Sequence, residues 1–327
     1  MGLYISFFLC FLLGVFNIRS TGQSHDEQSS QLVYKSGDQD SKIAFMFMAR
    51  GHMPLEDIWR EFFRWKANSS YYNIYVHPQG GYKYPLGSIF YGKEIKNIFN
   101  VKWGGITQVR GIKSLVRAAL EDPQNKWFCL MSESCIPLIP FNKWRNTLLI
   151  NEKSVVNACP MDHNEMETHT RWKASLEAVG LNKSHWRKSA NWVALNRKHA
   201  EIFANETRME PAWDGVICCD EHYLPTTLAY YGLDNETTCT DGFAHVHWTS
   251  LMAAHPHSYG SEEITPQLFA FLNRAKGEGP GFGMQCSGLP EVCHFTARKF
   301  SHATKYALLN NLDMILSEDH IPYKIKD

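Results

Sequence analysis

The sequence predicts an α/β domain with a mainly parallel central β-sheet. Short apolar runs typical of buried strands alternate with helical patterns in the first half of the chain, and this alternation indicates a parallel sheet. The 327 residues, 44% of them hydrophobic and 20% charged, are enough for one large domain or two small ones. The net charge is zero, so no basic field argues for a nucleic-acid partner.

The individual elements follow from local patterns. Predicted strands are short apolar runs, and they lie at residues 43–49, 72–77, 127–131, 192–195 and 243–248. Predicted helices have apolar residues at helical spacing or form longer buried runs, and they lie at residues 54–67, 107–120, 223–231 and 303–316. Pro54 suits the first turn of its helix, and Thr107 is the expected cap of the next one.

The N-terminal apolar run predicts a targeting segment. Residues 3–18 are sixteen residues long, a little short of the roughly 20 that span a bilayer. They form either a signal anchor (transmembrane) or a signal peptide, and the lack of a clear small-x-small cleavage site favours an anchor. We therefore divide the chain into this segment at 1–19, a flexible polar stem at 20–41 and a folded lumenal domain at 42–327.

Cysteines and glycosylation sequons indicate the secretory lumen. Beyond Cys10 the chain has eight cysteines, an even number suited to disulfides. Zinc binding is the rival use, but no CxxC or HxxxH spacing supports it. The adjacent Cys218 and Cys219 are expected to pair with different residues, one of them Cys239. Four sequons accompany the cysteines, at Asn68, Asn182, Asn205 and Asn235.

The candidate catalytic group is a pair of adjacent acids. Asp220 and Glu221 stand at the N-terminal end of a predicted helix, where the helix dipole favours negative charge. A carboxylate held at the mouth of a rigid element is well placed to act as a general base. An acidic cap on an ordinary helix explains the same residues, and taken alone they favour that simpler interpretation.

Two further segments indicate how a ligand would be bound. Arg298 and Lys299 lie in an apolar frame, which indicates an anion site more than a solvated surface. Ser132, Glu133 and Ser134 follow the third strand, at the edge where parallel sheets bind ligands. One carboxylate with two hydroxyls is a poor site for Mg²⁺ or Mn²⁺, so we expect no metal there. The segment either lines a pocket or forms a tight turn.

Seven segments form an ordered set across the chain. They are FMFMARG at 45–51, IYVH at 74–77, VKWG at 101–104, LMSESCIPL at 130–138, WRK at 186–188, DEHYLPT at 220–226 and ARKF at 297–300. Together they resemble the core-2/I-branching β-1,6-N-acetylglucosaminyltransferase family (glycosyltransferase family 14), especially its plant-type branch. Each segment is weak alone, but the ordered set is specific.

The resemblance implies a GT-A fold and an inverting glycosyltransferase that uses a UDP-sugar without a metal ion. Glu221 matches the family's catalytic base, which takes the proton of the acceptor hydroxyl. Lys299 matches the basic residue that faces the diphosphate, while its neighbour Arg298 is expected to point the other way. The DxD metal motif of other transferases occurs here only at 38–40, in the stem, where it is interpreted as solvated charge.

The resemblance also implies partners and a location. The donor is a UDP-sugar, the acceptor is a glycan or glycoprotein, and the N-terminal segment would anchor a type II protein in the Golgi membrane. The remaining matches to the family are less specific. They concern residues that would contact the ligands, and core packing is the alternative role for each. Trp103 would lie against the uracil, and Val76, His77 and Val246 would lie near the nucleotide. Trp248 would stack on the acceptor sugar, and Asp220 would line the pocket with segment 132–134.

The chain departs from the family in three places. One is Thr296, where a larger apolar residue is usual. Animal members carry a second basic residue before a cysteine near Cys286. Here residues 283–285 are Gly-Met-Gln, so that role is empty or moves to Arg274 or Lys276. Residues 160–175 do not align, which leaves the acceptor contacts open.

Several functions stay open on the sequence alone. Within the family the donor sugar would be N-acetylglucosamine, or else glucuronic acid or xylose. A glucuronate donor would require an additional cation near the sugar, for which Arg50, Arg187 and Lys188 are candidates. A carbohydrate-binding relative without catalysis is a second class. A structural glycoprotein is the third, and it leaves Arg298 and Lys299 unexplained.

Overall fold

The computed structural model describes residues 40–64, 68–160, 170–250, 253, 255–272 and 285–317. All of these belong to one compact unit of the chain, Lys35–Asp327. The predicted anchor at 1–19 and most of the predicted stem lie outside the described residues. Among the helices that are described, none is long and apolar enough to cross a membrane.

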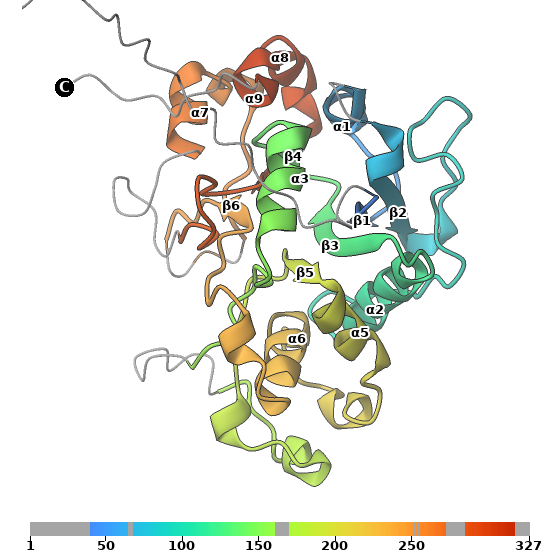
Figure 1. The fold of residues 1–327 in the computed structure, drawn as a ribbon, viewed down its shortest axis with the longest axis vertical. Coiled ribbons are helices and arrows are strands. Elements are labelled where there is room, and N and C mark those ends of the chain that lie inside the picture. The colour runs from blue at the N-terminus through green and yellow to red at the C-terminus, as the bar shows by residue number, and fades with distance from the viewer. Residues whose placement is uncertain are drawn as a thin grey trace, which may run out of the picture. The chain divides into compact units, whose positions relative to one another are not determined.

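The central sheet has four strands in the order β2-β1-β3-β5 (Figure 1). Strands β1 (Lys42–Ala49), β2 (Tyr72–Pro78) and β3 (Asn125–Ser132) run parallel, and β5 (Ala194–Asn196) pairs antiparallel with β3. The predicted mixed α/β fold with a mainly parallel sheet is therefore confirmed. Its parallel strands end together, because Ala49 pairs with Pro78 and Met48 with Ser132.

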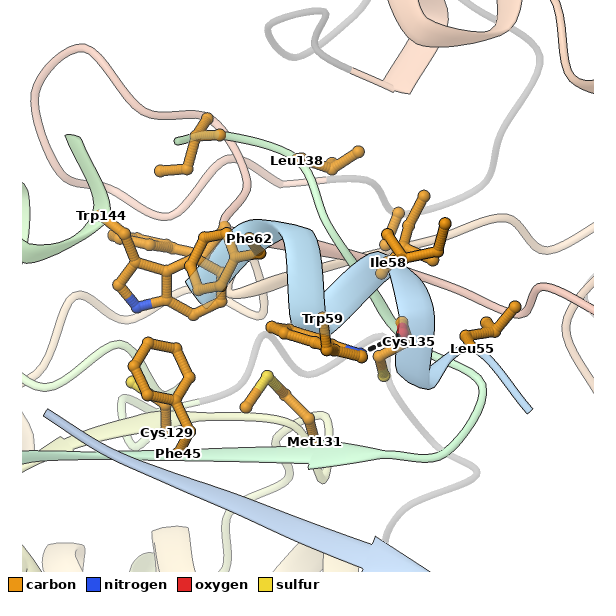
Figure 2. Packing of buried hydrophobic residues seen from close by; sticks show 14 of the residues in the cluster. Phe45, Leu55, Ile58, Trp59, Phe62, Cys129, Met131, Cys135, Leu138 and Trp144 are labelled. Atoms are coloured by element: carbon orange, nitrogen blue, oxygen red, sulfur yellow. Dashed lines mark hydrogen bonds between the residues drawn. The ribbon is translucent and has the colours of Figure 1, made fainter. Parts of the chain in front are cut away.

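Helices bury the two faces of this sheet in two separate cores. Helices α1 (Glu56–Arg64) and α3 (Phe141–Ile150) contribute to one core, whose central rings are Phe45, Trp59, Phe62 and Trp144 (Figure 2). Helices α2 (Ile106–Leu120), α5 (Arg197–Asn205) and α6 (Cys219–Tyr230) contribute to the other. Side chains alternate along a strand, so Phe45 and Met46 enter opposite cores.

A second, smaller sheet pairs strands from the C-terminal part of the chain with the strand that follows β3. Its order is β4 (Ile136–Pro137), β7 (Thr296–Arg298) and β6 (Ala244–Val246), with β7 antiparallel to β4 and parallel to β6. The predicted strand at 243–248 is thus shorter than expected. Short helices complete this part: α7 (Pro266–Leu272), α8 (Lys305–Leu309) and α9 (Asp313–Leu316). The predicted single helix at 303–316 is divided between the last two.

Two disulfides join described cysteines, Cys159–Cys239 and Cys286–Cys293. Cys129, Cys135, Cys218 and Cys219 are buried free thiols. The prediction that Cys239 pairs with Cys218 or Cys219 is therefore wrong. Cys219 starts α6 and packs in the α2–α5–α6 core, and Cys218 lies against Gly104, so neither faces Cys239.

Candidate active site

The two adjacent acids lie in the first turn of α6, as the sequence predicts. The preceding Cys218 has a left-handed backbone conformation with φ of 50°, which turns the chain into the helix. The side chain of Glu221 is 32% exposed, whereas a carboxyl oxygen of Asp220 is buried without a hydrogen-bond partner among the described residues. The same turn therefore presents one accessible carboxylate and one carboxyl group that has a buried oxygen.

Glu221 is held by an arginine that the sequence reasoning missed. Arg171 Nη1 lies 2.7 Å from Glu221 Oε2 and 3.3 Å from His222 Nε2. Arg171 falls in the region 160–175 that could not be aligned. The sequence does not indicate which acid this arginine binds, because the two residues are 50 positions apart.

Asp220 is tied to the loop that carries Trp103. Gln108 Nε2 donates to Asp220 Oδ2 (2.8 Å), and Gln108 Oε1 accepts from the Gly104 N–H (2.9 Å). The Cys219 N–H donates to the Gly104 carbonyl (3.1 Å). Burial raises the pKa of Asp220 to about 7, and the neighbouring Glu221 adds to that rise.

This loop and turn lie near the carboxyl ends of the parallel strands. Gly111 follows Gln108 by one helical turn, and a Cβ placed on it would lie 3.1 Å from Met48 Cε and 3.3 Å from His77 Nε2. Met48 and His77 are close to the ends of β1 and β2. The acids of α6 and the segment 132–134 after β3 are therefore at the same edge of the sheet, where α/β proteins bind ligands.

Trp103 lies on the surface of this loop. Its side chain is 68% exposed, and its ring meets the edge of His255 at a centroid distance of 5.9 Å. Core packing, the alternative that the sequence left open, is thus excluded for Trp103. A large exposed ring close to a carboxylate is suited to stacking on a planar or sugar ligand.

Val76 and His77 lie in the interior instead. Neither side chain has exposed surface, and His77 Nε2 accepts a hydrogen bond from the Phe99 N–H (2.9 Å). Their side chains therefore pack in the interior, which is the alternative to a nucleotide contact that the sequence left open. Val246, opposite Arg298 in the small sheet, and Trp248 are both partly exposed.

The predicted anion site gathers cations from two sheets. The Phe300 N–H donates to the Ser134 carbonyl (3.0 Å), which fixes β7 beside the end of β3. Burial lowers the pKa of Lys299, and the charges of Arg298 and Arg50 lower it further. Arg50, at the end of β1, is 3.8 Å from Glu133. Positive charge is in excess here, because three cations surround one carboxylate.

Arg298 and Ser132 are more buried than Lys299, whereas Ser134 is partly exposed. The Arg298 guanidinium lies over the Trp192 ring at 4.7 Å, and burial lowers its pKa. Ser132 Oγ is 3.0 Å from Ser134 Oγ. Within the described ranges, no group of three or more His, Cys, Asp or Glu residues is arranged to hold a metal ion.

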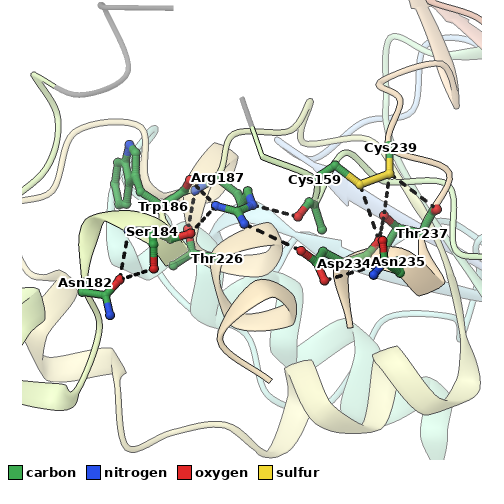
Figure 3. A network of polar contacts seen from close by, with 11 residues as sticks. Cys159, Asn182, Ser184, Trp186, Arg187, Thr226, Asp234, Asn235, Thr237 and Cys239 are labelled. Carbon is green, nitrogen blue, oxygen red and sulfur yellow. Dashed lines mark hydrogen bonds and ion pairs between the residues drawn. A yellow bond between two sulfur atoms is a disulfide. The ribbon is translucent and has the colours of Figure 1, made fainter. Parts of the chain in front are cut away.

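Arg187 is a structural residue and not a free cation for a donor sugar. It donates to the Ala158 carbonyl (3.0 Å) and the Ser184 carbonyl (2.6 Å), and it lies 3.7 Å from Asp234 (Figure 3). The proposal that Arg187 binds a glucuronate is therefore wrong, because its guanidinium is buried and engaged. Arg50 and Lys188 remain candidates for that role. Arg274 and Lys276, the alternatives for the family's second basic residue, lie outside the described residues.

The four sequon asparagines are all exposed, which leaves each accessible to a glycosylating enzyme. They are Asn68, Asn182, Asn205 and Asn235. Their glycosylation stays a prediction.

The fold and the groups at this edge of the sheet indicate which class of enzyme the protein belongs to. A mixed α/β domain with a central sheet, a carboxylate and an excess of cations fits a GT-A-like glycosyltransferase that uses a nucleotide-sugar donor and a glycan acceptor. Comparison with known proteins agrees, because residues 43–273 match the family model described as "Branch: Core-2/I-Branching enzyme". The chain belongs to the core-2/I-branching enzyme family and is a glycosyltransferase.

One curated relative is similar over most of its length. It is "Glycosyltransferase BC10" of Oryza sativa subsp. japonica, which is 26% identical over 308 residues. The alignment covers 83% of this chain and 76% of the relative.

Proposed function

We propose that the protein transfers a sugar from a UDP-sugar to a hydroxyl group of a glycan or glycoprotein, with inversion and without a metal ion. N-acetylglucosamine is the donor sugar that we propose first, with glucuronic acid and xylose as the alternatives in this family. The observation that carries the proposal is Glu221. It is a partly exposed carboxylate in the first turn of α6, at the ligand-binding edge of the sheet.

In this mechanism Glu221 is the general base. Arg171 binds its Oε2, and we assign Oε1 to the acceptor hydroxyl. The acceptor oxygen attacks the anomeric carbon and loses its proton to Oε1, while the bond from that carbon to the diphosphate oxygen breaks and UDP leaves. Attack on the face opposite the leaving group inverts the anomeric centre, so a single base suffices.

Lys299 would stabilise the departing UDP. A cation aimed at the developing diphosphate charge performs the electrostatic role that a divalent metal has in other enzymes. Arg50 and Arg298 act electrostatically on Lys299 and add to the positive field. Trp103 would stack on the uracil and Trp248 on the acceptor sugar.

We also propose that the enzyme is a type II protein of the Golgi membrane with a lumenal catalytic domain. Two disulfides and four exposed sequon asparagines support an oxidising, glycosylating compartment. The anchor would be the apolar segment at residues 3–18.

Release of UDP from a panel of UDP-sugars tests the function. The purified full-length protein is assayed in EDTA with a mixed glycan acceptor pool. We expect release from one donor, at least a thousandfold slower in Glu221→Gln, with UDP binding within about threefold of wild type. Glu177→Gln, which alters an exposed glutamate, is the matched control and keeps full activity.

Three results would contradict parts of this proposal. Full activity of Glu221→Gln would remove Glu221 as the base. Activity that requires Mn²⁺ would overturn the role of Lys299. UDP binding without release from any donor would favour a carbohydrate-binding relative without catalysis.

A further inference from the structure

The ring of His222 is held in one tautomer. His222 follows Glu221 in α6 and is fully buried, and its Nδ1 lies 2.7 Å from the Arg187 carbonyl oxygen. A carbonyl only accepts, so Nδ1 carries the hydrogen. Burial lowers the pKa of His222 to about 3, so the ring is neutral and Nε2 is an acceptor.

Arg171 donates to two consecutive residues of α6. Its Nη1 is 3.3 Å from His222 Nε2 and 2.7 Å from Glu221 Oε2. A guanidinium nitrogen of this kind carries two hydrogens and never accepts, so one atom satisfies both contacts. His222 and Glu221 thereby fix the place of Arg171 together.

The acceptor that His222 offers is rigid. Its ring stacks on Trp186 with a centroid distance of 4.2 Å and an interplanar angle of 14°. Trp186 stacks in turn on Trp213 (5.6 Å). The Arg187 backbone is fixed as well, because its N–H donates to Thr226 Oγ1 (3.1 Å) on the same helix (Figure 3).

We infer that His222 and Arg171 are positioning residues for Glu221, with His222 holding Arg171 and Arg171 holding the carboxylate. This inference rests on the proposed role of Glu221 as the base. The hold restricts rotation of the Glu221 side chain and turns Oε1 toward the acceptor hydroxyl. A base held in one orientation reacts faster than one that samples several rotamers.

The test compares kcat and KM for three variants of the full-length enzyme. His222→Phe preserves a ring on Trp186 but removes the acceptor, His222→Gln retains a side-chain oxygen, and Arg171→Gln removes the cation. Arg208→Gln is the matched arginine control at an exposed site. These four variants and the double variant Arg171→Gln/His222→Phe are assayed with the donor sugar that the wild type uses.

We expect Arg171→Gln and His222→Phe to lower kcat about tenfold or more, with the KM of the donor within about twofold. His222→Gln recovers part of kcat, and Arg171→Gln/His222→Phe is no slower than Arg171→Gln alone, because both act through one contact.

The inference is overturned if Arg171→Gln, a change at a partly exposed side chain, retains the wild-type kcat. Additive losses in the double variant would also overturn it. If His222→Phe does not fold, Arg171→Gln and His222→Gln still decide the matter. Activity in Glu221→Gln would instead defeat the proposed function, whereas an inactive Glu221→Gln beside an unaffected Arg171→Gln defeats only this inference.

Discussion

Replacing Asp220 by asparagine should stabilise the protein at neutral and alkaline pH. Asp220 ionises in the unfolded chain near its ordinary value of 3.8, but in the folded protein its pKa is raised to about 7. Between these values the folded state binds more protons than the unfolded state. The free energy of unfolding therefore falls as pH rises through this window, and the loss is complete above pH 7.

The size of the effect follows from the difference between the two pKa values. One unit corresponds to about 1.4 kcal/mol, so the rise from 3.8 to about 7 is at most ~4 kcal/mol. Asparagine does not titrate, and its side-chain oxygen still accepts from Gln108. We expect Asp220→Asn to be up to ~4 kcal/mol more stable than wild type at pH 8, with little difference at pH 4.

Thermal unfolding of both proteins at pH 4 and pH 8 measures this prediction. At about 2 °C per kcal/mol for a protein of this size, the melting temperature of Asp220→Asn should exceed that of wild type by several degrees at pH 8. Asp214→Asn, at an exposed carboxylate, is the control and should change stability by less than about 0.5 kcal/mol. An equal difference at both pH values would refute the reasoning, because a structural effect of the amide does not depend on pH.

Two further predictions concern buried positions on α2. Gly111→Ala should lower the free energy of unfolding by ~1–3 kcal/mol in urea, because the new Cβ would lie 3.1 Å from Met48 Cε and from Val101 Cγ2. This crowding opposes the higher helix propensity of alanine, and a gain in stability would contradict it. Lys113→Met should lower the free energy of unfolding by ~2–4 kcal/mol in the same assay, because the Lys113 side chain is fully buried and its Nζ lies 2.8 Å from Glu210 Oε1. A loss below about 1 kcal/mol would show that this ion pair does not stabilise the fold.

Local sequence patterns are enough to predict the main elements of this fold. The three parallel strands and α2 appear within one or two residues of the predicted ranges, because each forms a continuous buried run or an amphipathic face. The first helix is shorter at its start, where α1 begins at Glu56. The acids 220 and 221 open α6 as predicted, since charge at a helix N-terminus is a local preference.

Partners far apart in the chain could not be predicted. Gln108 and Asp220 are 112 residues apart, and Arg171 and Glu221 are 50 apart. Neither contact can be predicted from local sequence, because the first depends on how α2 packs on α6 and the second on how the loop that carries Arg171 packs on α6. The same reason explains the wrong partner for Cys239, whose disulfide closes on Cys159.

The sequence by itself determined the α/β class, the family through its ordered motifs, and the acid pair that the proposed chemistry uses. Only the tertiary structure decided that Arg171 contacts both Glu221 and His222, and that one carboxyl oxygen of Asp220 is buried. It also decided that Val76, His77 and Arg187 are structural. Residue type and spacing fix what a segment prefers locally. Burial and pairing across the fold decide which of two chemically similar groups meets solvent and ligand.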